Sequence, residues 1–254
     1  MVKKRFFYAI LFTLFVLFIN CDILDFGRNL EDPEAPSAPQ FIPQSLPTDS
    51  SQSGIGPADY YKGIYLEWYT NDEDDIGGYY LYRSTDSQDS KFEILDTIEV
   101  LTNITQYNNY VDTLVNYYTN YYYYMTAYDY NGNESKTSDT IRYMLTEKVD
   151  LVTPDGEIST DQNNFQWYDF TNLTNEYIIE LQNLESSEIM WISRFNRPSY
   201  GSREQIVEYN FDNNGKKLEE RQIYRWRIHS ISMVDKYNRD ISGAVSYWNY
   251  FSIQ

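Results

Sequence analysis

Few side chains in this sequence could serve as a catalytic nucleophile or base. The 254 residues include a single cysteine, Cys21, and a single histidine, His229. The histidine lies in an alternating stretch on the parity opposite Trp226 and Ile228, so we expect it to face solvent. The chain also lacks a Gly-x-Ser-x-Gly motif, a phosphate-binding loop and a dinucleotide-binding glycine pattern. The sequence therefore predicts a protein that is not an enzyme and that uses no cofactor.

Acidic side chains are abundant, since 38 aspartates and glutamates contribute to a formal net charge of -18 at pH 7. Nucleic acid would repel such a chain, so we exclude it as a partner. A glycosidase needs two carboxylates flanking a cleft, but the space between the sheets of a small sandwich is filled by side chains. We therefore interpret the charge as a source of solubility rather than of catalysis.

Two acidic loops were natural candidates for metal sites. Asn71 to Asp75 holds four acids, and Asp129, Asn131 and Asn133 alternate as in a calcium loop. Calcium takes about six to eight oxygen ligands, and an EF-hand loop also needs a glycine and a glutamate at fixed positions that the second loop lacks. We expect solvated charge in the first loop, a hairpin turn in the second, and no metal in either.

Tyrosine is the residue type best suited to form a binding surface, and the chain has 27 of them. Period-two alternation places five tyrosines on the outward parity of two predicted strands: Tyr80, Tyr82, Tyr122, Tyr124 and Tyr128. Tyrosine offers a large rigid surface and a hydroxyl at low entropic cost, which suits a binding face. The alternative is that aromatic pairs simply stabilise the sheet, because tyrosine also has high strand propensity.

The elements that would position these residues are strands. Residues 64–69 and 121–128 alternate with a period of two, and Asn131-Gly132 supplies a tight turn into a strand at 139–144. Residues 48–57, rich in Ser and Gly, are expected to form a loop. No segment has a convincing helical period. Short strands at regular spacing predict an all-β chain built as β-sandwiches.

Four spaced motifs closely resemble a fibronectin type III domain. They are Trp68, Gly78 to Ser84, Tyr110-Val111-Asp112 and Tyr121 to Ser135. The resemblance covers residues 35–146 and implies that the tryptophan lies on strand B, the second motif on strand C and the last on strand F. It also implies that strands C and F are neighbours in one sheet, so that the five tyrosines share one exposed face.

The residues after 146 repeat this plan with more divergence. Three stretches correspond to the tryptophan strand, strand C and strand F: Phe165 to Trp167, Tyr177 to Leu181 and Tyr224 to Ile228. Ser246 to Ile253 is expected to close the sheet, Glu188 to Phe195 to form a further strand, and Ser199 to Asn214 to be a long connection. We therefore expect a second, divergent fibronectin type III-like sandwich.

The first residues have the pattern of a secretory leader. Basic residues at 3–5 precede an apolar run, Phe6 to Ile19, that is shorter than the roughly 20 residues a membrane span needs. Cys21 follows Leu17-Phe18-Ile19-Asn20, which resembles the lipobox of bacterial lipoproteins. The resemblance implies a mature chain that starts at Cys21 and carries lipid there. A plain signal peptide or an uncleaved anchor is the alternative.

These observations give four expected regions: a signal peptide (1–20), a lipidated tether (21–34), a fibronectin type III domain (35–146) and a second, divergent one (147–254). The expected function is that of a non-catalytic lipoprotein of the bacterial cell envelope, anchored to the membrane by lipid on Cys21, which serves as a binding or spacer module. Its partner would be an envelope protein or a surface polymer. The alternative is an accessory carbohydrate-binding subunit of a polysaccharide-degrading system.

Overall fold

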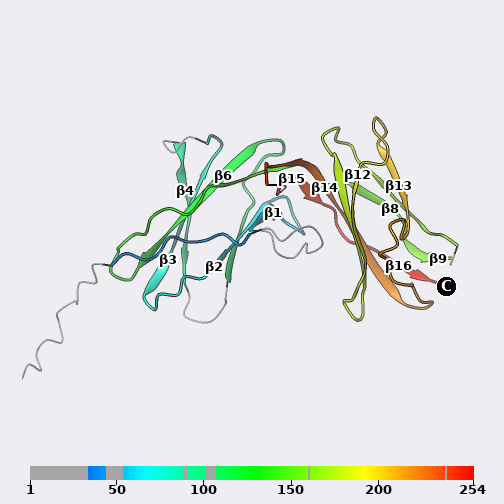
Figure 1. The fold of residues 1–254 in the computed structure, drawn as a ribbon, viewed down its shortest axis with the longest axis horizontal. Coiled ribbons are helices and arrows are strands. Elements are labelled where there is room, and N and C mark those ends of the chain that lie inside the picture. The colour runs from blue at the N-terminus through cyan, green and yellow to red at the C-terminus, as the bar shows by residue number, and fades with distance from the viewer. Residues whose placement is uncertain (1–33, 44–53, 88–90, 101–106, 160, 238) are drawn as a thin grey trace, which may run out of the picture. The chain divides into compact units, whose positions relative to one another are not determined.

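The computed structural model describes residues 34–43, 54–87, 91–100, 107–159, 161–237 and 239–254 (Figure 1). Every named element in these ranges is a β-strand, so the all-β prediction is confirmed. None of these residues belongs to a helix long and apolar enough to cross a membrane. The leader, Cys21 and most of the tether lie outside the described residues.

The first half of the chain forms a three-stranded sheet and contributes four strands to a ten-stranded sheet that continues into the second half; it is coloured from cyan to green in Figure 1. The smaller sheet has the order β1-β2-β5, with β1 at Ile55–Pro57, β2 at Ile64–Tyr69 and β5 at Tyr107–Asp112. The four strands in the larger sheet have the order β4-β3-β6-β7, with β3 at Ile76–Ser84, β4 at Glu93–Glu99, β6 at Asn120–Asp129 and β7 at Ile141–Leu145. All pairings among these strands of the first half are antiparallel.

A core of large side chains lies between these sheets. Trp68 on β2 and Tyr79 on β3 are fully buried and meet edge to face, with ring centroids 5.6 Å apart. Leu81, Tyr123 and Met125 are also fully buried. Each belongs to the inward parity of its strand, because successive side chains of a strand point to opposite faces. Burial of such aromatic side chains supplies a large share of the hydrophobic free energy.

The second half repeats this arrangement around its own core. Its three-stranded sheet has the order β13-β10-β8, with β8 at Asp150–Thr153, β10 at Asn164–Tyr168 and β13 at Glu204–Glu208. The facing strands are β9 at Gly156–Ile158, β11 at Glu176–Asn183, β12 at Ile189–Asn196, β14 at Ile223–Val234, β15 at Asp240–Val245 and β16 at Asn249–Ile253. Strand β14 pairs with β15 along one part of its length and with β16 along another. The fully buried side chains here include Trp167, Tyr177, Trp191 and Trp226.

Each half has a tyrosine corner, in which a tyrosine near the start of the long strand accepts a hydrogen bond from the backbone shortly before it. The Tyr121 hydroxyl accepts from the amide of Asn116 at 3.0 Å. The Tyr224 hydroxyl accepts from the amide of Glu219 at 2.8 Å. The same feature at the same place in both halves supports the interpretation that the second half repeats the first.

The larger sheets of the two halves are joined by one parallel pairing. Met144 and Leu145 of β7 lie opposite Ser242 and Gly243 of β15. Gly243 is required on the other side of β15, because a Cβ atom there would lie 2.1 Å from the carbonyl oxygen of Ser230. Glu34–Gln254 accordingly form one compact unit with two separate hydrophobic cores.

The prediction of a loop at 48–57 is wrong at the end of this range, where Ile55–Pro57 forms strand β1. Backbone pairing explains the difference: the amide of Glu67 donates to Gly54 O at 2.9 Å, and the chain passes close to Ile42. A Cβ atom on Gly54 would lie 1.9 Å from Ile42 O, so the glycine that favours a loop by composition serves a close approach of backbones here. The expected long connection at 199–214 likewise contains strand β13.

Candidate functional site

The pairing of β3 with β6 brings the five predicted tyrosines onto one face of the larger sheet of the first half. Tyr82 lies directly opposite Tyr124, and Tyr80 opposite Thr126. Tyr122 and Tyr128 lie opposite Ser84 and Gly78. All five side chains are half-buried, while the alternate residues of both strands are buried in the core. We call this set of five residues, with Phe92, the tyrosine face.

The rings of the tyrosine face stack on one another across the two strands. Tyr82 and Tyr124 have centroids 4.6 Å apart at an interplanar angle of 21°, and Tyr80 and Tyr128 have centroids 4.7 Å apart at 27°. Phe92 lies on Tyr124 at 4.7 Å, tilted by 48°. Such pairs contribute about 0.5–1.5 kcal/mol each beyond their buried area. The stacking therefore fixes these rings and covers one face of each stacked ring.

A glycine creates the space for one of these rings. A Cβ atom on Gly78 would lie 2.5 Å from the Tyr128 hydroxyl oxygen and 2.3 Å from the carbonyl oxygen of Ile98. The ring of Tyr128 can therefore lie against the backbone of β3 only because residue 78 has no side chain. The Gly78 that marked strand C in the sequence thus has a direct role in building the face.

Two hydroxyl groups of the tyrosine face, those of Tyr82 and Tyr128, have a raised pKa and stay protonated at neutral pH. Burial first, and then the negative charge of Glu134, raises the pKa of Tyr82. The Glu134 carboxylate accepts hydrogen bonds from Tyr82 at 3.3 Å and from the Thr126 hydroxyl at 2.7 Å. Burial and neighbouring groups also raise the pKa of Tyr128. The face therefore presents neutral hydrogen-bonding groups beside an acidic side chain.

Both acidic loops have structural hydrogen bonds. The Glu73 carboxylate accepts from the Ser37 amide at 2.6 Å, which ties the loop 71–75 to the segment before the first sandwich. Asp129 Oδ1 accepts from the amides of Asn131 and Asn133 at 2.9 and 2.8 Å, and Gly132 has φ = 87°. This is a side-chain-stabilised turn, as predicted. Across the described ranges, no group of three or more His, Cys, Asp or Glu side chains is arranged to hold a metal ion.

The prediction that His229 faces solvent is wrong. Its position on β14 does lie on the outward parity, but its side chain retains only 16% of its exposed area. Glu180 of β11 lies beside it, with Nε2 and Oε2 3.4 Å apart. Burial lowers the pKa of His229, and the charge of Arg227 lowers it further. Glu180 opposes this shift but does not outweigh it. Side chains from other strands cover the His229 ring. The alternation of residues along a single strand gives the side to which a side chain points, but not what covers it there.

His229 belongs to a group of residues that sequence reasoning missed, which we call the charged cluster: Glu180, Arg225, Arg227, His229 and Trp248. Arg227 Nε donates to Glu180 Oε2 at 2.7 Å. Arg225 and Arg227 both place their guanidinium carbon 4.3 Å from the ring centroid of Trp248. Burial would raise the pKa of Glu180, but the hydrogen bond with His229 and the charge of Arg227 outweigh it and hold that pKa at about 2.

Lys148 connects this region with the first half. Its Nζ donates to the carbonyl oxygens of Ala58 and Asp59 at 3.2 Å each and of Val245 at 2.6 Å. Arg227 Nη1 lies 3.1 Å from Asp59 Oδ1. Burial lowers the pKa of Lys148 to about 8, with Asp59 opposing and Arg227 assisting this shift. Two cations from the second half thus meet the 58–59 segment of the first.

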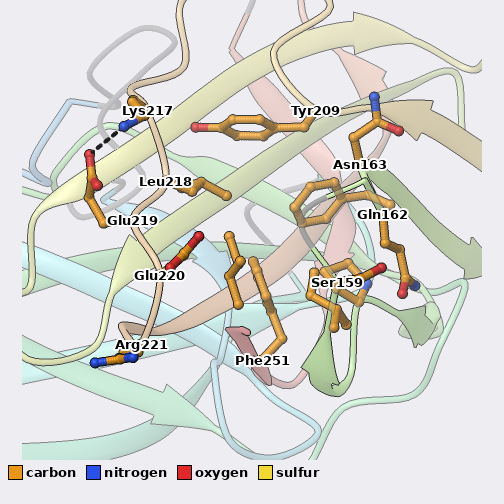
Figure 2. A pocket seen from close by; sticks show the side chains of 14 residues that line it. Ser159, Gln162, Asn163, Tyr209, Lys217, Leu218, Glu219, Glu220, Arg221 and Phe251 are labelled. Carbon is orange, nitrogen blue, oxygen red and sulfur yellow. Dashed lines mark ion pairs between the residues drawn. The ribbon is translucent and has the colours of Figure 1, made fainter.

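A cavity of about 730 Å³ opens at one end of the second sandwich. Its lining comes from the segments around 154–165, 209, 217–221 and 251–253 (Figure 2). Figure 2 shows Leu218 and Phe251 near its centre and the Tyr209 ring along one side. Sequence reasoning missed this cavity, because its residues are scattered over four segments and share no motif.

No protein-family model matches the chain. No curated protein matches it either. Among solved structures, the chain is distantly similar to the crystal structure of chicken CNTN1 FN1-FN3 domains, with 12% identity, a TM-score of 0.32, and coverage of 87% of this chain and 69% of that chain.

Proposed function

We propose that this protein is a non-catalytic binding module made of two fibronectin type III-like sandwiches, and that it captures a protein partner through the tyrosine face. The strand orders β1-β2-β5 and β4-β3-β6-β7, with a tyrosine corner in each half, support the fibronectin type III-like assignment. The lipobox-like sequence ending at Cys21 supports a lipid anchor on the bacterial cell envelope.

The observation that carries the proposal is the stacked geometry of the tyrosine face. Five rings of the face, those of Tyr80, Tyr82, Phe92, Tyr124 and Tyr128, are held in place before any partner arrives, so little side-chain entropy is lost on binding. Protein interfaces are enriched in aromatic side chains such as tyrosine at their centre and have polar residues around them. This favours a protein partner over a spacer role.

The same geometry argues against a polysaccharide ligand. A sugar ring packs on the free face of an aromatic side chain. In the tyrosine face Tyr124 contacts both Tyr82 and Phe92, and Tyr80 stacks on Tyr128, so one face of each stacked ring is already covered by a neighbouring ring. A protein surface, by contrast, can contact ring edges and hydroxyl groups.

The test is capture from envelope extract by cross-linking to the tagged protein. Replacing Tyr80→Ser together with Tyr124→Ser should reduce recovery of the captured protein by roughly tenfold or more, since interface tyrosines commonly contribute over 1 kcal/mol each. The control pair is Tyr60→Ser with Tyr200→Ser, because both side chains are 69% exposed and lie off the face. Thermal unfolding of each variant separates loss of binding from loss of fold.

Three results would contradict the proposal. Undiminished capture by the face variant would return the tyrosines to a purely structural role. Binding to a polysaccharide panel that depends on Tyr80 and Tyr124 would replace the protein partner with a glycan. Capture of no protein at all would leave a spacer as the better description.

The anchor has a separate test. Labelled palmitate should enter the wild-type protein in a bacterial host and should not enter the Cys21→Ala variant. Equal labelling of the two proteins, or none in either, would remove the lipoprotein assignment without affecting the binding proposal.

A further inference from the structure

The cavity of the second sandwich has an apolar floor. Four residues of the buried core line it, namely Ile158, Phe165, Phe251 and Ile253, and Leu218, which packs against that core, lines it as well. Its volume of about 730 Å³ falls within the roughly 300–1,000 Å³ of small-molecule sites. An occupant would therefore need an apolar body.

The charged side chains of the lining divide into two groups. Lys217 Nζ and Glu219 Oε1 lie 3.3 Å apart and form an ion pair with each other (Figure 2). Arg221 extends away from the cavity in the same view. The Glu220 carboxylate, in contrast, turns toward the apolar side chains. Among the described lining residues, Glu220 is therefore the charge that an occupant would meet.

The backbone on both sides of Glu220 is held in a defined turn. Arg221 has φ = 63°, a left-handed conformation that is uncommon for a residue other than glycine. Its amide donates to the carbonyl oxygen of Ile253 at 2.9 Å, and the Glu219 amide donates to the Tyr224 hydroxyl of the tyrosine corner. These hydrogen bonds fix the turn from which the Glu220 side chain extends.

We propose that this cavity binds a small organic cation, with the ammonium or guanidinium group at Glu220 and the apolar body against Leu218 and Phe251. The Tyr209 ring lies at the edge of the cavity, where it can contact the apolar body or the cation. The net charge of -18 raises the local concentration of cations around the whole chain. Ser159, Gln162 and Asn163 supply neutral hydrogen-bonding groups on the opposite side.

Phenethylammonium is the probe for this site, titrated by calorimetry into the full-length protein. A molecule of this size should bind with a Kd of about 1 mM. Two molecules with the same body are compared with it: 3-phenylpropionate, which is an anion, and 2-phenylethanol, which is neutral. The anion should bind at least about tenfold more weakly than the cation, because it would approach Glu220 with like charge.

Two neighbouring glutamates give a matched pair of variants. Glu220→Gln should weaken phenethylammonium binding about fivefold and leave 2-phenylethanol unchanged. Glu219→Gln should change neither affinity, because its carboxylate is paired with Lys217. Both side chains are exposed, so neither substitution should change the thermal midpoint. Leu218→Trp, which fills the cavity, should remove binding of all three molecules.

Equal affinity for the cation and the anion would overturn the proposal, and so would equal effects of the two glutamate variants. The absence of saturable binding by phenethylammonium would also overturn it. None of these results bears on the tyrosine face, which lies on the other sandwich.

Discussion

The outward face of the larger sheet differs between the two sandwiches. In the first, β3 and β6 present stacked tyrosines, whereas in the second the corresponding strands β11 and β14 present Glu180, Arg227 and His229. Tyrosine pairs remain partly exposed, but Arg227 and Glu180 are buried by their neighbours and by Asp59. The same strand order thus supplies an open surface in one half and a closed ionic junction in the other.

The inward faces, in contrast, are alike. Trp68 meets Tyr79 edge to face at 5.6 Å, and Trp167 meets Tyr177 in the same way at 5.0 Å. The difference lies at the tyrosine hydroxyl. Tyr79 accepts from the backbone amide of Asn71, whereas Tyr177 donates to Asp169, which also pairs with Arg197. The core shape is therefore shared, and its polar partners are specific to each half.

The largest effect that tests this comparison is expected at Arg197. Its side chain and that of Asp169 are 3% and 0% exposed, so Arg197→Met leaves a buried carboxylate without its cation. Unfolding free energy should fall by about 3–5 kcal/mol. Arg83, the ion-pair partner of Asp112, has a side chain that is 26% exposed. Arg83→Met should therefore lower the unfolding free energy clearly less. Urea unfolding of both variants measures the difference, and equal losses would mean that the two halves use their buried ion pairs alike.

A smaller effect is expected at Lys148, where the two halves meet. Lys148→Met removes three hydrogen bonds to carbonyl oxygens and should lower the unfolding free energy by about 1–3 kcal/mol. Lys136→Met, at an exposed position, is the control and should have almost no effect. In NMR of the methylated protein, Lys148 should titrate near pH 8, below the ordinary lysine value of 10.5. A titration near pH 10.5 would show that the amine is open to solvent.

The tyrosine face should contribute less to stability than to binding. Tyr124→Ser removes one stacked pair and one tilted pair and should cost about 1–2 kcal/mol of unfolding free energy. Tyr124→Phe keeps both ring contacts and should be nearly neutral. Thermal unfolding compares the two variants. If Tyr124→Phe destabilised the protein as much as Tyr124→Ser, the hydroxyl group rather than stacking would hold the face together.

The smallest effect concerns pH. Because burial lowers the pKa of His229 below its ordinary value of 6.5, the unfolded chain binds more protons than the folded one just below that pH. The contribution of His229 is therefore complete above pH 6.5 and declines as the pH falls through the folded pKa. Glu180, with its pKa of about 2, loses its contribution only below about pH 4.5. His229→Gln should remove the first decline in urea unfolding and keep the second; an unchanged first decline would assign it to another group.

Strand parity explains which parts could be predicted from the sequence. The alternation in 79–83 and 121–128 gave the correct outward and inward sides of the tyrosines, because each side chain's direction follows from its own strand. The burial of His229 could not be predicted in this way. It depends on Glu180 and Arg227, which reach the ring through strand pairing and side-chain packing.

Strand β1 and the cavity could not be predicted from the sequence, for related reasons. Strand β1 contains Gly56 and Pro57, both poor strand formers, and exists because β2 offers it a backbone ladder. The cavity results from side chains in separate segments that fail to fill one end of the second sandwich. Neither the identity nor the spacing of those residues indicates an unfilled volume before the chain is folded.

The parallel pairing of β7 with β15 also affects how the protein would carry tension. A pull between Glu34 and Gln254 must pass from one sandwich to the other along residues 146–149, across this ladder, or through the contacts of Lys148 and Arg227 with residues 58–59. The ladder includes Met144 and Leu145 opposite Ser242 and Gly243, and Thr146 adds a bond from its amide to Gly243 O at 3.0 Å. The connecting residues can therefore lengthen only after these bonds shear, which would make the junction between the two sandwiches a stiff link rather than a loose one.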